Sequence, residues 1–194
     1  MVASLPASGP LSVVDSGTGT GYYLAQVRSS RFDPVSALAV DASQAAVTMS
    51  VAATGSCGLV ADVWRPSPIR TARADAVLCV FAPRNPAEFV RFLRADGTLV
   101  TVTPASDHLT ELHAAGLLLG MQPDKLAKLD ESLEPHFDLA DRSRLRYTVE
   151  LDTAAARDLT SMGPSGHHEI TREWPGGSVT VAVDVSAYKP KQPR

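Results

Sequence analysis

The sequence is poor in residues that several classes of protein require. Its 194 residues include two cysteines, Cys57 and Cys79, and only 6% of them are aromatic. The cysteines form no CxxC pair and have no histidines at zinc-ligand spacing, so we expect no metal site and predict that both thiols are buried core residues. No apolar run approaches the ~20 residues of a membrane-spanning helix, and no basic segment precedes an apolar run at the start. We therefore expect a cytoplasmic protein with no membrane partner and no signal peptide.

An excess of positive charge is also missing. Eighteen Lys and Arg residues stand against 21 Asp and Glu residues, which gives a net charge of −3. Indiscriminate binding to nucleic acid depends largely on contacts between cations and phosphates, so this balance disfavours it. The remaining composition, 44% hydrophobic and 20% charged, is that of a globular protein. We predict one domain over residues 1–188 and a disordered basic tail over residues 189–194.

Short apolar runs alternate with helical stretches in the first half of the chain. Because the runs are continuous rather than alternating, they are typical of parallel strands that are buried on both faces. This pattern predicts an α/β fold with a mostly parallel sheet and helices on both faces. The expected strands are residues 11–14, 35–40, 57–60, 76–81 and 98–103. The expected helices are residues 22–28, 42–53 with Ser43 as a cap, and 86–94, which leads to a turn at Asp96-Gly97.

The second half of the chain changes its pattern. Residues 107–121, 123–133 and 154–162 are predicted to be helices, separated by punctuating Gly and Pro residues. Residues 137–152 and 178–188 alternate in hydropathy, which is typical of strands with one exposed face. We expect these two strands to form an antiparallel hairpin at one edge of the sheet.

A glycine-rich loop follows the first expected strand, and acidic residues end the first three. Gly17, Gly19 and Gly21 would let the backbone approach a ligand closely and direct helix amides toward it. Asp15 ends the first strand, and Asp41, 22 residues after Gly19, ends the second, where a carboxylate can accept hydrogen bonds from a ribose. Asp62 follows the third strand, where an adenine amino group could be recognised. Together these residues predict an adenosine pocket at the carboxyl ends of adjacent strands.

Two other interpretations compete with the pocket. The glycines could form only a tight turn and the aspartates could only cap helices, but turn formation does not require a carboxylate after three successive strands. A nicotinamide dehydrogenase is disfavoured because the spacing is GxGxG rather than GxGxxG.

Several segments resemble a known family across almost the whole chain. Residues 13–23 resemble the first motif of class I S-adenosylmethionine-dependent methyltransferases, whose fold is Rossmann-like. The segments Phe-Ala-Pro-Arg-Asn at 81–85 and Thr-Pro-x-x-Asp-His-Leu at 103–109 are similar to the 23S ribosomal RNA guanine-N1 methyltransferases, especially those that protect against tylosin-like macrolides. The resemblance implies S-adenosyl-L-methionine as the cofactor and 23S ribosomal RNA as the partner. It leaves open which guanine is modified and whether the protein is a homodimer.

The resemblance also assigns roles to individual residues. It implies that Gly17, Gly19 and Thr20 line the methionine and ribose side of the cofactor, with Asp41 at the ribose, Asp62 at the adenine and His108 near the reactive end. Guanine N1 carries a proton that must leave, and a carboxylate or a neutral imidazole could accept it, so Asp107 and His108 are the candidate catalytic residues. For Asp107 the alternative is a helix cap.

The target base would have to be splayed out of a hairpin loop and stacked on an aromatic side chain. Trp64, Phe81 and Trp174 are the candidate platforms, with burial in the core as the alternative for each. His167 stands where the family tends to have a tryptophan, so no base-contacting role is assigned to it.

Members of this family begin with a four-ligand zinc module and a helical segment ahead of the first methyltransferase strand, and neither is recognisable in these residues. The chain therefore resembles a methyltransferase core without that front portion. The alternatives to a ribosomal RNA methyltransferase are a truncated, non-catalytic remnant and a small-molecule methyltransferase.

Overall fold

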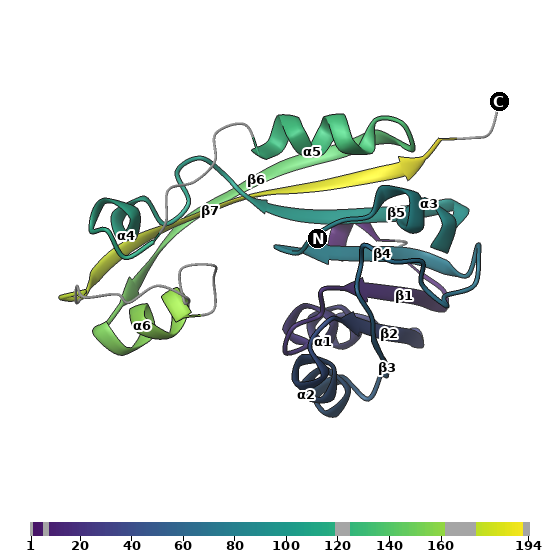
Figure 1. Ribbon diagram of the computed structural model, residues 1–194, viewed down its shortest axis with the longest axis horizontal. Coiled ribbons are helices and arrows are strands. Elements are labelled where there is room, and N and C mark those ends of the chain that lie inside the picture. The colour runs from purple at the N-terminus through teal and green to yellow at the C-terminus, as the bar shows by residue number, and fades with distance from the viewer. Residues whose placement is uncertain (1, 6–7, 119–124, 162–173, 192–194) are drawn as a thin grey trace. The chain divides into compact units, whose positions relative to one another are not determined.

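The computed structural model describes residues 2–5, 8–118, 125–161 and 174–191. Its central feature is a seven-stranded sheet in the order β3-β2-β1-β4-β5-β7-β6 (Figure 1). The fold class is confirmed as a mostly parallel α/β sheet with antiparallel C-terminal strands. The first five strands are β1 Leu11–Ser16, β2 Val35–Asp41, β3 Cys57–Val60, β4 Ala74–Val80 and β5 Leu93–Pro104.

The first five strands pair in parallel, and their order reverses next to β1. β2 and β3 extend the sheet on one side of β1, while β4 and β5 extend it on the other. Strand β1 is almost wholly buried, and β4 is buried in every residue except Asp75, as continuous apolar runs require. In open α/β sheets the crevice at such a reversal, outside the carboxyl ends of the strands, is where ligands bind. The topology therefore predicts a ligand site at the loops that follow β1 and β4.

Three helices connect these strands. They are α1 Tyr22–Ser29, α2 Gln44–Thr54 and α3 Pro86–Phe92, and α1 and α2 pack against each other beside β2 (Figure 1). The predicted cap Ser43 is confirmed, because its hydroxyl accepts a hydrogen bond from the amide of Ala46. Asn85 caps α3 in the same way through the amide of Glu88. Leu24 and Val27 of α1 are fully buried against the sheet, so this face of α1 anchors the loop that precedes it.

The remaining elements agree in type with the prediction but differ in length. A short 3-10 helix, Val2–Ser4, precedes β1. The helix expected over residues 107–121 is reduced to the single turn of α4, and residues 119–124 lie outside the described residues. The other elements are α4 Thr110–Ala114, α5 Lys125–Leu133, β6 Phe137–Leu151, α6 Thr153–Ser161 and β7 Gly177–Pro190.

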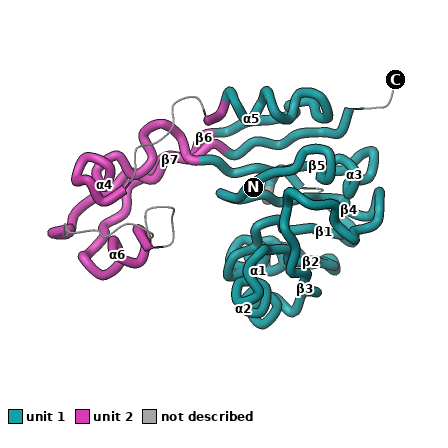
Figure 2. The backbone as a smooth tube through the Cα atoms, in the orientation of Figure 1, with its two compact units in different colours: residues 1–103, 127–143, 185–194 teal, residues 104–126, 144–184 magenta. Residues whose placement is uncertain are grey.

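The chain forms two compact units that interleave along the sequence (Figure 2). The first contains residues 1–103, 127–143 and 185–194, and therefore all five parallel strands with α1, α2 and α3. The second contains residues 104–126 and 144–184, with α4 and α6 around a small cluster that includes Leu112 and Val179. The single domain predicted for residues 1–188 stays a prediction.

Three details of the prediction are wrong. Cys57 is exposed rather than buried, because β3 is the edge strand of the sheet, while Cys79 on the inner strand β4 is buried as predicted. Asp96 and Gly97 lie within β5, where a register shift against β4 accommodates the extra residues. Lys189 and Pro190 end β7 instead of beginning a disordered tail, and the ammonium group of Lys189 donates to Thr98 and to the carbonyl of Asp96. Residues 192–194 lie outside the described residues.

Candidate cofactor pocket

The glycine loop is held against the end of β2. The amides of Gly17 and Thr18 both donate to the carbonyl oxygen of Val40, at 2.8 and 3.0 Å, and Gly17, Gly19 and Gly21 all have positive φ. Left-handed backbone of this kind favours glycine, which explains why three glycines alternate here. A Cβ atom on Gly19 would meet nothing within 4 Å, so this residue borders open space. The predicted Thr20 lies exposed at the tip of the same loop.

Asp15 is a buried carboxyl group at the end of β1. Its side chain accepts a hydrogen bond from the hydroxyl of Thr18 at 2.8 Å, and Thr18 lies 2.9 Å from the hydroxyl of Ser50 on α2. Burial raises the pKa of Asp15 to about 6, the bond from Thr18 opposes the shift, and the charge of Asp41 adds to it. A buried carboxyl whose charge is this costly favours a cationic ligand, because a nearby cation would offset that cost.

Asp41 joins the glycine loop to the start of α2. One carboxylate oxygen accepts from the amide of Gly19 at 3.1 Å and the other from the amide of Ser43 at 2.9 Å. A carboxylate offers about four lone-pair sites, so two remain for a ligand. Asp41 therefore has both the position and the remaining acceptor capacity that a ribose site requires.

Asp62 lies on the loop after β3 and borders a pocket. Its carboxylate accepts from the amide of Trp64 at 3.0 Å and lies 3.6 Å from the guanidinium of Arg65. The pocket is small and lies against β1, β2 and α3. Its lining includes Val14, Val40, Ala61, Ile69, Phe89 and Phe92. The lining is mostly apolar, with Asp62 and Glu88 as its acidic residues, and Asp62 could accept a hydrogen bond from the amino group of a base bound beside it.

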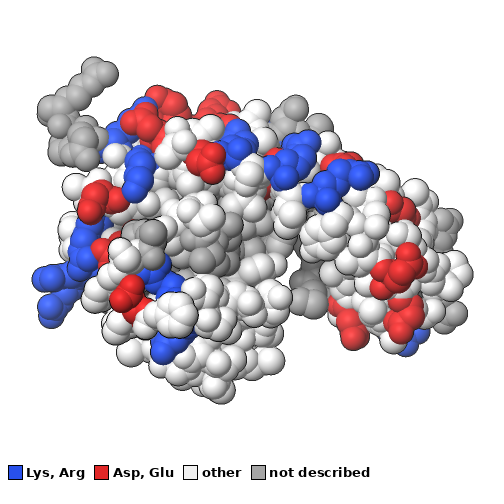
Figure 3. All heavy atoms as spheres, turned by 180° about the vertical axis from the view of Figure 1, so that it is seen from behind, with Lys and Arg blue, Asp and Glu red and all other residues white. Residues whose placement is uncertain are grey.

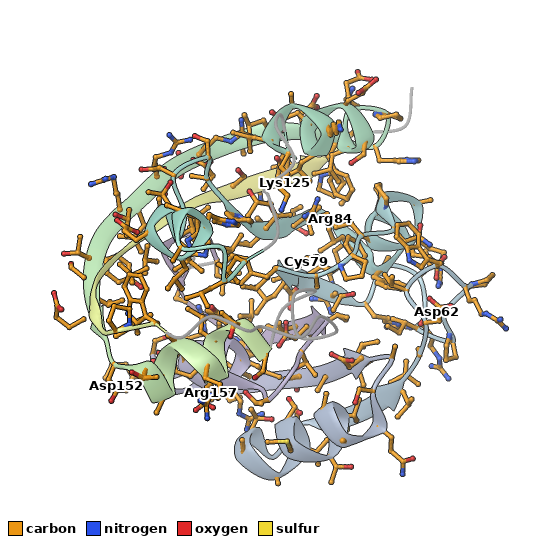
Figure 4. All side chains as sticks on the ribbon, turned by 60° about the vertical axis from the view of Figure 1, so that its left-hand side comes forward. Asp62, Cys79, Arg84, Lys125, Asp152 and Arg157 are labelled. Carbon is orange, nitrogen blue, oxygen red and sulfur yellow. The ribbon has the colours of Figure 1, made fainter. Side chains whose placement is uncertain are left out.

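The loop after β4 meets the glycine loop. A Cβ atom on Gly17 would lie 2.2 Å from the Cβ of Ala82, so the two loops are in close contact at the reversal of the sheet. Cys79 and Arg84 lie side by side at this end of β4, whereas Asp62 lies on a separate loop (Figure 4). Burial raises the pKa of the Cys79 thiol to about 11, so the thiol is neutral and is not a nucleophile at physiological pH.

The close contact between Gly17 and Ala82 can be tested by substitution. Gly17→Ala is expected to lower the free energy of unfolding by about 1–3 kcal/mol more than Gly19→Ala, because both strain the backbone but only Gly17→Ala overpacks against Ala82. Chemical denaturation of the two variants measures the difference. Adding Ala82→Gly to Gly17→Ala should restore most of the difference, and equal stabilities for the two single variants would contradict the contact.

The candidate catalytic residues Asp107 and His108 belong to the second unit. Asp107 accepts from the guanidinium of Arg146 at 2.8 Å, and this interaction lowers the pKa of its carboxyl group. It does not cap α4, because the N-cap position is Leu109, which has left-handed backbone and makes no side-chain cap. Nδ1 of His108 accepts from the amide of Ala182 at 3.2 Å, and burial lowers the pKa of the ring. The neutral ring then carries its proton on Nε2, so there it donates a hydrogen bond rather than accepting a proton.

The candidate aromatic platforms differ in their surroundings. Trp64 is 67% exposed and Phe81 is 48% exposed. Trp174 packs on the core cluster of the second unit, and its indole donates to the carbonyl of Leu151. These contacts favour a core residue over a platform for a base. His167 lies outside the described residues. The sequence did not predict the contact of Ser50 with Thr18 of the glycine loop. Nothing in its position on the helix distinguishes Ser50 from any other serine.

Basic and acidic side chains are interspersed on the face shown in Figure 3. Three arginines of β6 form ion pairs: Arg142 with Asp130, Arg144 with Asp184 and Arg146 with Asp107. Much of this basic charge is therefore already balanced by carboxylates. Among the described residues, no helix has the length and apolar character needed to cross a bilayer, and no group of three or more metal-ligating side chains occurs.

Comparisons with known proteins find curated relatives of this chain. No family model matches the chain. The 23S rRNA (guanine(748)-N(1))-methyltransferase of Streptomyces fradiae is 42% identical over 193 residues, which cover 95% of this chain and 69% of that protein. A relative from Micromonospora griseorubida is 38% identical over 194 residues, which cover 95% of this chain and 65% of the relative.

Solved structures support the fold. A methyltransferase of Geobacter sulfurreducens in complex with S-adenosyl-L-homocysteine is 19% identical, covers 98% of this chain and 88% of its own, and has a TM-score of 0.59. The [4+2]-cyclase SpnF has a TM-score of 0.63 at 14% identity, covering 97% of this chain and 78% of its own. These likenesses identify the Rossmann-like fold, which hosts more than one chemistry. The sequence relationship is closer, and by it the chain belongs to the family of 23S ribosomal RNA guanine-N1 methyltransferases.

Proposed function

We propose that this protein binds S-adenosyl-L-methionine and transfers its methyl group to N1 of a guanine in 23S ribosomal RNA. The observation that carries the proposal is the set of three acidic residues, Asp15, Asp41 and Asp62, at the carboxyl ends of neighbouring parallel strands around one glycine loop. The substrate follows from the 42% identity to the Streptomyces fradiae enzyme. We treat residues 1–188 as one methyltransferase domain that acts in the cytoplasm, where ribosomal RNA is found.

The residues present fit the cofactor. Asp41 would hold the ribose hydroxyls with its remaining lone pairs, and Asp62 would accept from the adenine amino group beside the apolar pocket. The open space at Gly19 gives the backbone a close approach to the ligand. The buried carboxyl of Asp15 would lie toward the cationic methionine end, with Gly17, Thr20 and Gly21 completing the loop.

When bound, the cofactor supplies an activated methyl group on a sulfonium ion. The protein then has to hold the acceptor in line, exclude water and handle one proton. For the proton we propose Asp107 as the acceptor, because its carboxylate keeps lone pairs beyond the one that accepts from Arg146, whereas Nδ1 of His108 has a single lone pair that already accepts from Ala182. His108 would act near the reactive end of the cofactor as a hydrogen-bond donor through Nε2.

Calorimetry and a transfer assay test this function. The expected result is saturable binding of S-adenosyl-L-methionine, followed by incorporation of labelled methyl groups into deproteinised 23S RNA. Absence of cofactor binding would overturn the proposal. Binding without incorporation into RNA would instead favour the small-molecule methyltransferase or the non-catalytic protein.

A further inference from the structure

The loop after β4 fixes an arginine next to the glycine loop. Ala82, two residues before Arg84, is in contact with Gly17. The thiol of Cys79 lies 3.5 Å from the carbonyl oxygens of Ala82 and Pro83 and interacts with the side chain of Arg84. On the other side of Arg84, the side-chain amide of Asn85 donates to the backbone carbonyl of Val63 at 2.9 Å. These contacts place Arg84 at the reversal of the sheet, where the reacting groups of ligand and substrate would meet.

Among the described residues, Arg31 and Arg84 are the arginines whose Nε atom is buried without an acceptor, and Arg84 is the one on the loop beside Gly17. Within the same residues, six arginines form ion pairs with carboxylates: Arg65, Arg91, Arg94, Arg142, Arg144 and Arg146. A buried donor that lacks an acceptor costs free energy, so its position indicates an acceptor that arrives with a ligand.

An aromatic group lies on the same loop. The backbone of Phe81 has a φ of 53°, which is rare for a bulky residue, and its side chain is 48% exposed. The Phe81 ring lies 6.5 Å from the ring of Tyr23 at the start of α1, and Tyr23 makes an edge contact with Tyr22 at 5.3 Å. Exposed aromatic rings are the surfaces on which unstacked nucleic-acid bases are held.

We propose that Arg84 recognises O6 of the target guanine while the base stacks on Phe81 and Tyr23, which makes Arg84 a specificity-determining residue. The proposal rests on the proposed function and names a recognition element of the same site. Guanine presents O6 and N7 as acceptors on one edge, and arginine is the side chain that most often recognises this pair. Adenine carries an amino group in place of O6. This group and the guanidinium are both donors, so they cannot form a hydrogen bond with each other.

The chemistry at N1 gives Arg84 a second effect. During methylation the N1–H bond breaks and its proton goes to a base, the N1 electron pair forms the new N1–C bond, and the former S–C pair remains on sulfur. The negative charge left by the proton is shared with O6. A guanidinium at O6 stabilises this charge as it develops, so Arg84 should favour proton loss from N1 as well as binding of guanine.

A binding experiment tests the recognition without requiring catalysis. Guanosine 5′-monophosphate and 2-aminopurine riboside 5′-monophosphate, which lacks O6, are titrated by NMR into protein saturated with S-adenosyl-L-homocysteine. We expect a preference for the guanosine nucleotide of about 10-fold or more, lost in Arg84→Gln and partly kept in Arg84→Lys. Arg73→Gln, at the exposed position just before β4, is the matched control and should keep the preference. An unchanged preference in folded Arg84→Gln would overturn the proposal, as would equal affinities in the wild type.

A transfer experiment separates this proposal from the proposed function. With 23S RNA as substrate, Arg84→Gln should lower the transfer rate about 10-fold or more, and the rate should keep rising at pH values where that of the wild type has levelled off. A parallel pH profile at unchanged rate would contradict the role of Arg84. If the wild type transfers no methyl group but keeps the guanosine preference, the proposed function fails while the recognition by Arg84 stands.

Discussion

Replacing Asp41 by alanine is expected to weaken binding of S-adenosyl-L-methionine about 100-fold or more, because two charge-assisted hydrogen bonds to the ribose would be lost together. The carboxylate already accepts from the amides of Gly19 and Ser43, so its orientation is set before any ligand binds. Isothermal titration calorimetry of wild type and variant measures the change. Asp41→Asn keeps one carbonyl oxygen and should give an intermediate affinity.

A control is needed to separate the loss of ribose contacts in Asp41→Ala from a change in the structure of the loop. Asp41→Ala also releases the two amides, which would loosen the glycine loop and the start of α2. Ser43→Ala removes the cap of the same helix and should cost about 1 kcal/mol of stability while leaving the cofactor affinity almost unchanged. If Ser43→Ala weakened binding as strongly as Asp41→Ala, the ribose assignment would be wrong and the loss would be structural.

The second large effect concerns the stability of the ligand-free protein. Asp15→Asn is expected to raise the free energy of unfolding above neutral pH by about 3 kcal/mol, the equivalent of the pKa rise from 3.8 to about 6. The reason is that the native protein buries this carboxyl, whereas the unfolded chain exposes it to water. Asparagine keeps an oxygen that can accept the hydrogen bond from Thr18 and carries no charge.

The direction of the pH dependence follows from proton binding. Between pH 3.8 and about 6 the native state holds the Asp15 proton and the unfolded state does not. Stability from this group is therefore fully present below pH 3.8, falls as the pH rises through about 6 and is constant above that value. The groups near Asp15 that share this environment are Asp41 and Cys79, and neither is changed by the substitution.

Urea unfolding at a series of pH values measures this effect. The stability of Asp15→Asn minus that of the wild type should grow from pH 4 to pH 7, and taking the difference cancels the titration of all other groups. A flat difference would show that the carboxyl of Asp15 is not held at a raised pKa.

The same carboxyl links cofactor binding to protons. If the cationic end of the cofactor lies near Asp15, it lowers the pKa of this carboxyl, so binding below pH 6 releases a proton. Calorimetry in two buffers with different ionisation enthalpies measures that release. The variant Asp15→Asn should bind more weakly and release no proton at this site.

Much of the first unit was predictable because its signals are local. Continuous apolar runs indicate strands that are buried on both faces, and the alternating glycines at 17, 19 and 21 indicate positive φ angles that the structure confirms. The cap at Ser43 and the acidic strand ends at Asp15 and Asp41 depend on residues within a few positions in the chain. Short-range patterns of this kind are carried by the sequence itself.

Other features depend on which strands become neighbours. Cys57 has the same apolar sequence context as a core residue, but β3 ends up at the edge of the sheet, so Cys57 is exposed. The length of β7 was underestimated because Lys189 is fixed by Thr98 and the carbonyl of Asp96, about ninety positions away in the chain. No local pattern near residue 189 reports on that pairing.

The sequence by itself determined the α/β class, the glycine loop and the acids that flank it, because each rests on residue spacing along one segment. Only the tertiary structure decided which polar side chains are buried and which partners they have. It enclosed Asp15 and raised its pKa to about 6, engaged Nδ1 of His108 with the amide of Ala182, and left Nε of Arg84 buried at the reversal of the sheet. These outcomes depend on contacts between segments distant in sequence, and burial of charged or polar groups is a property of the assembled fold rather than of any one segment.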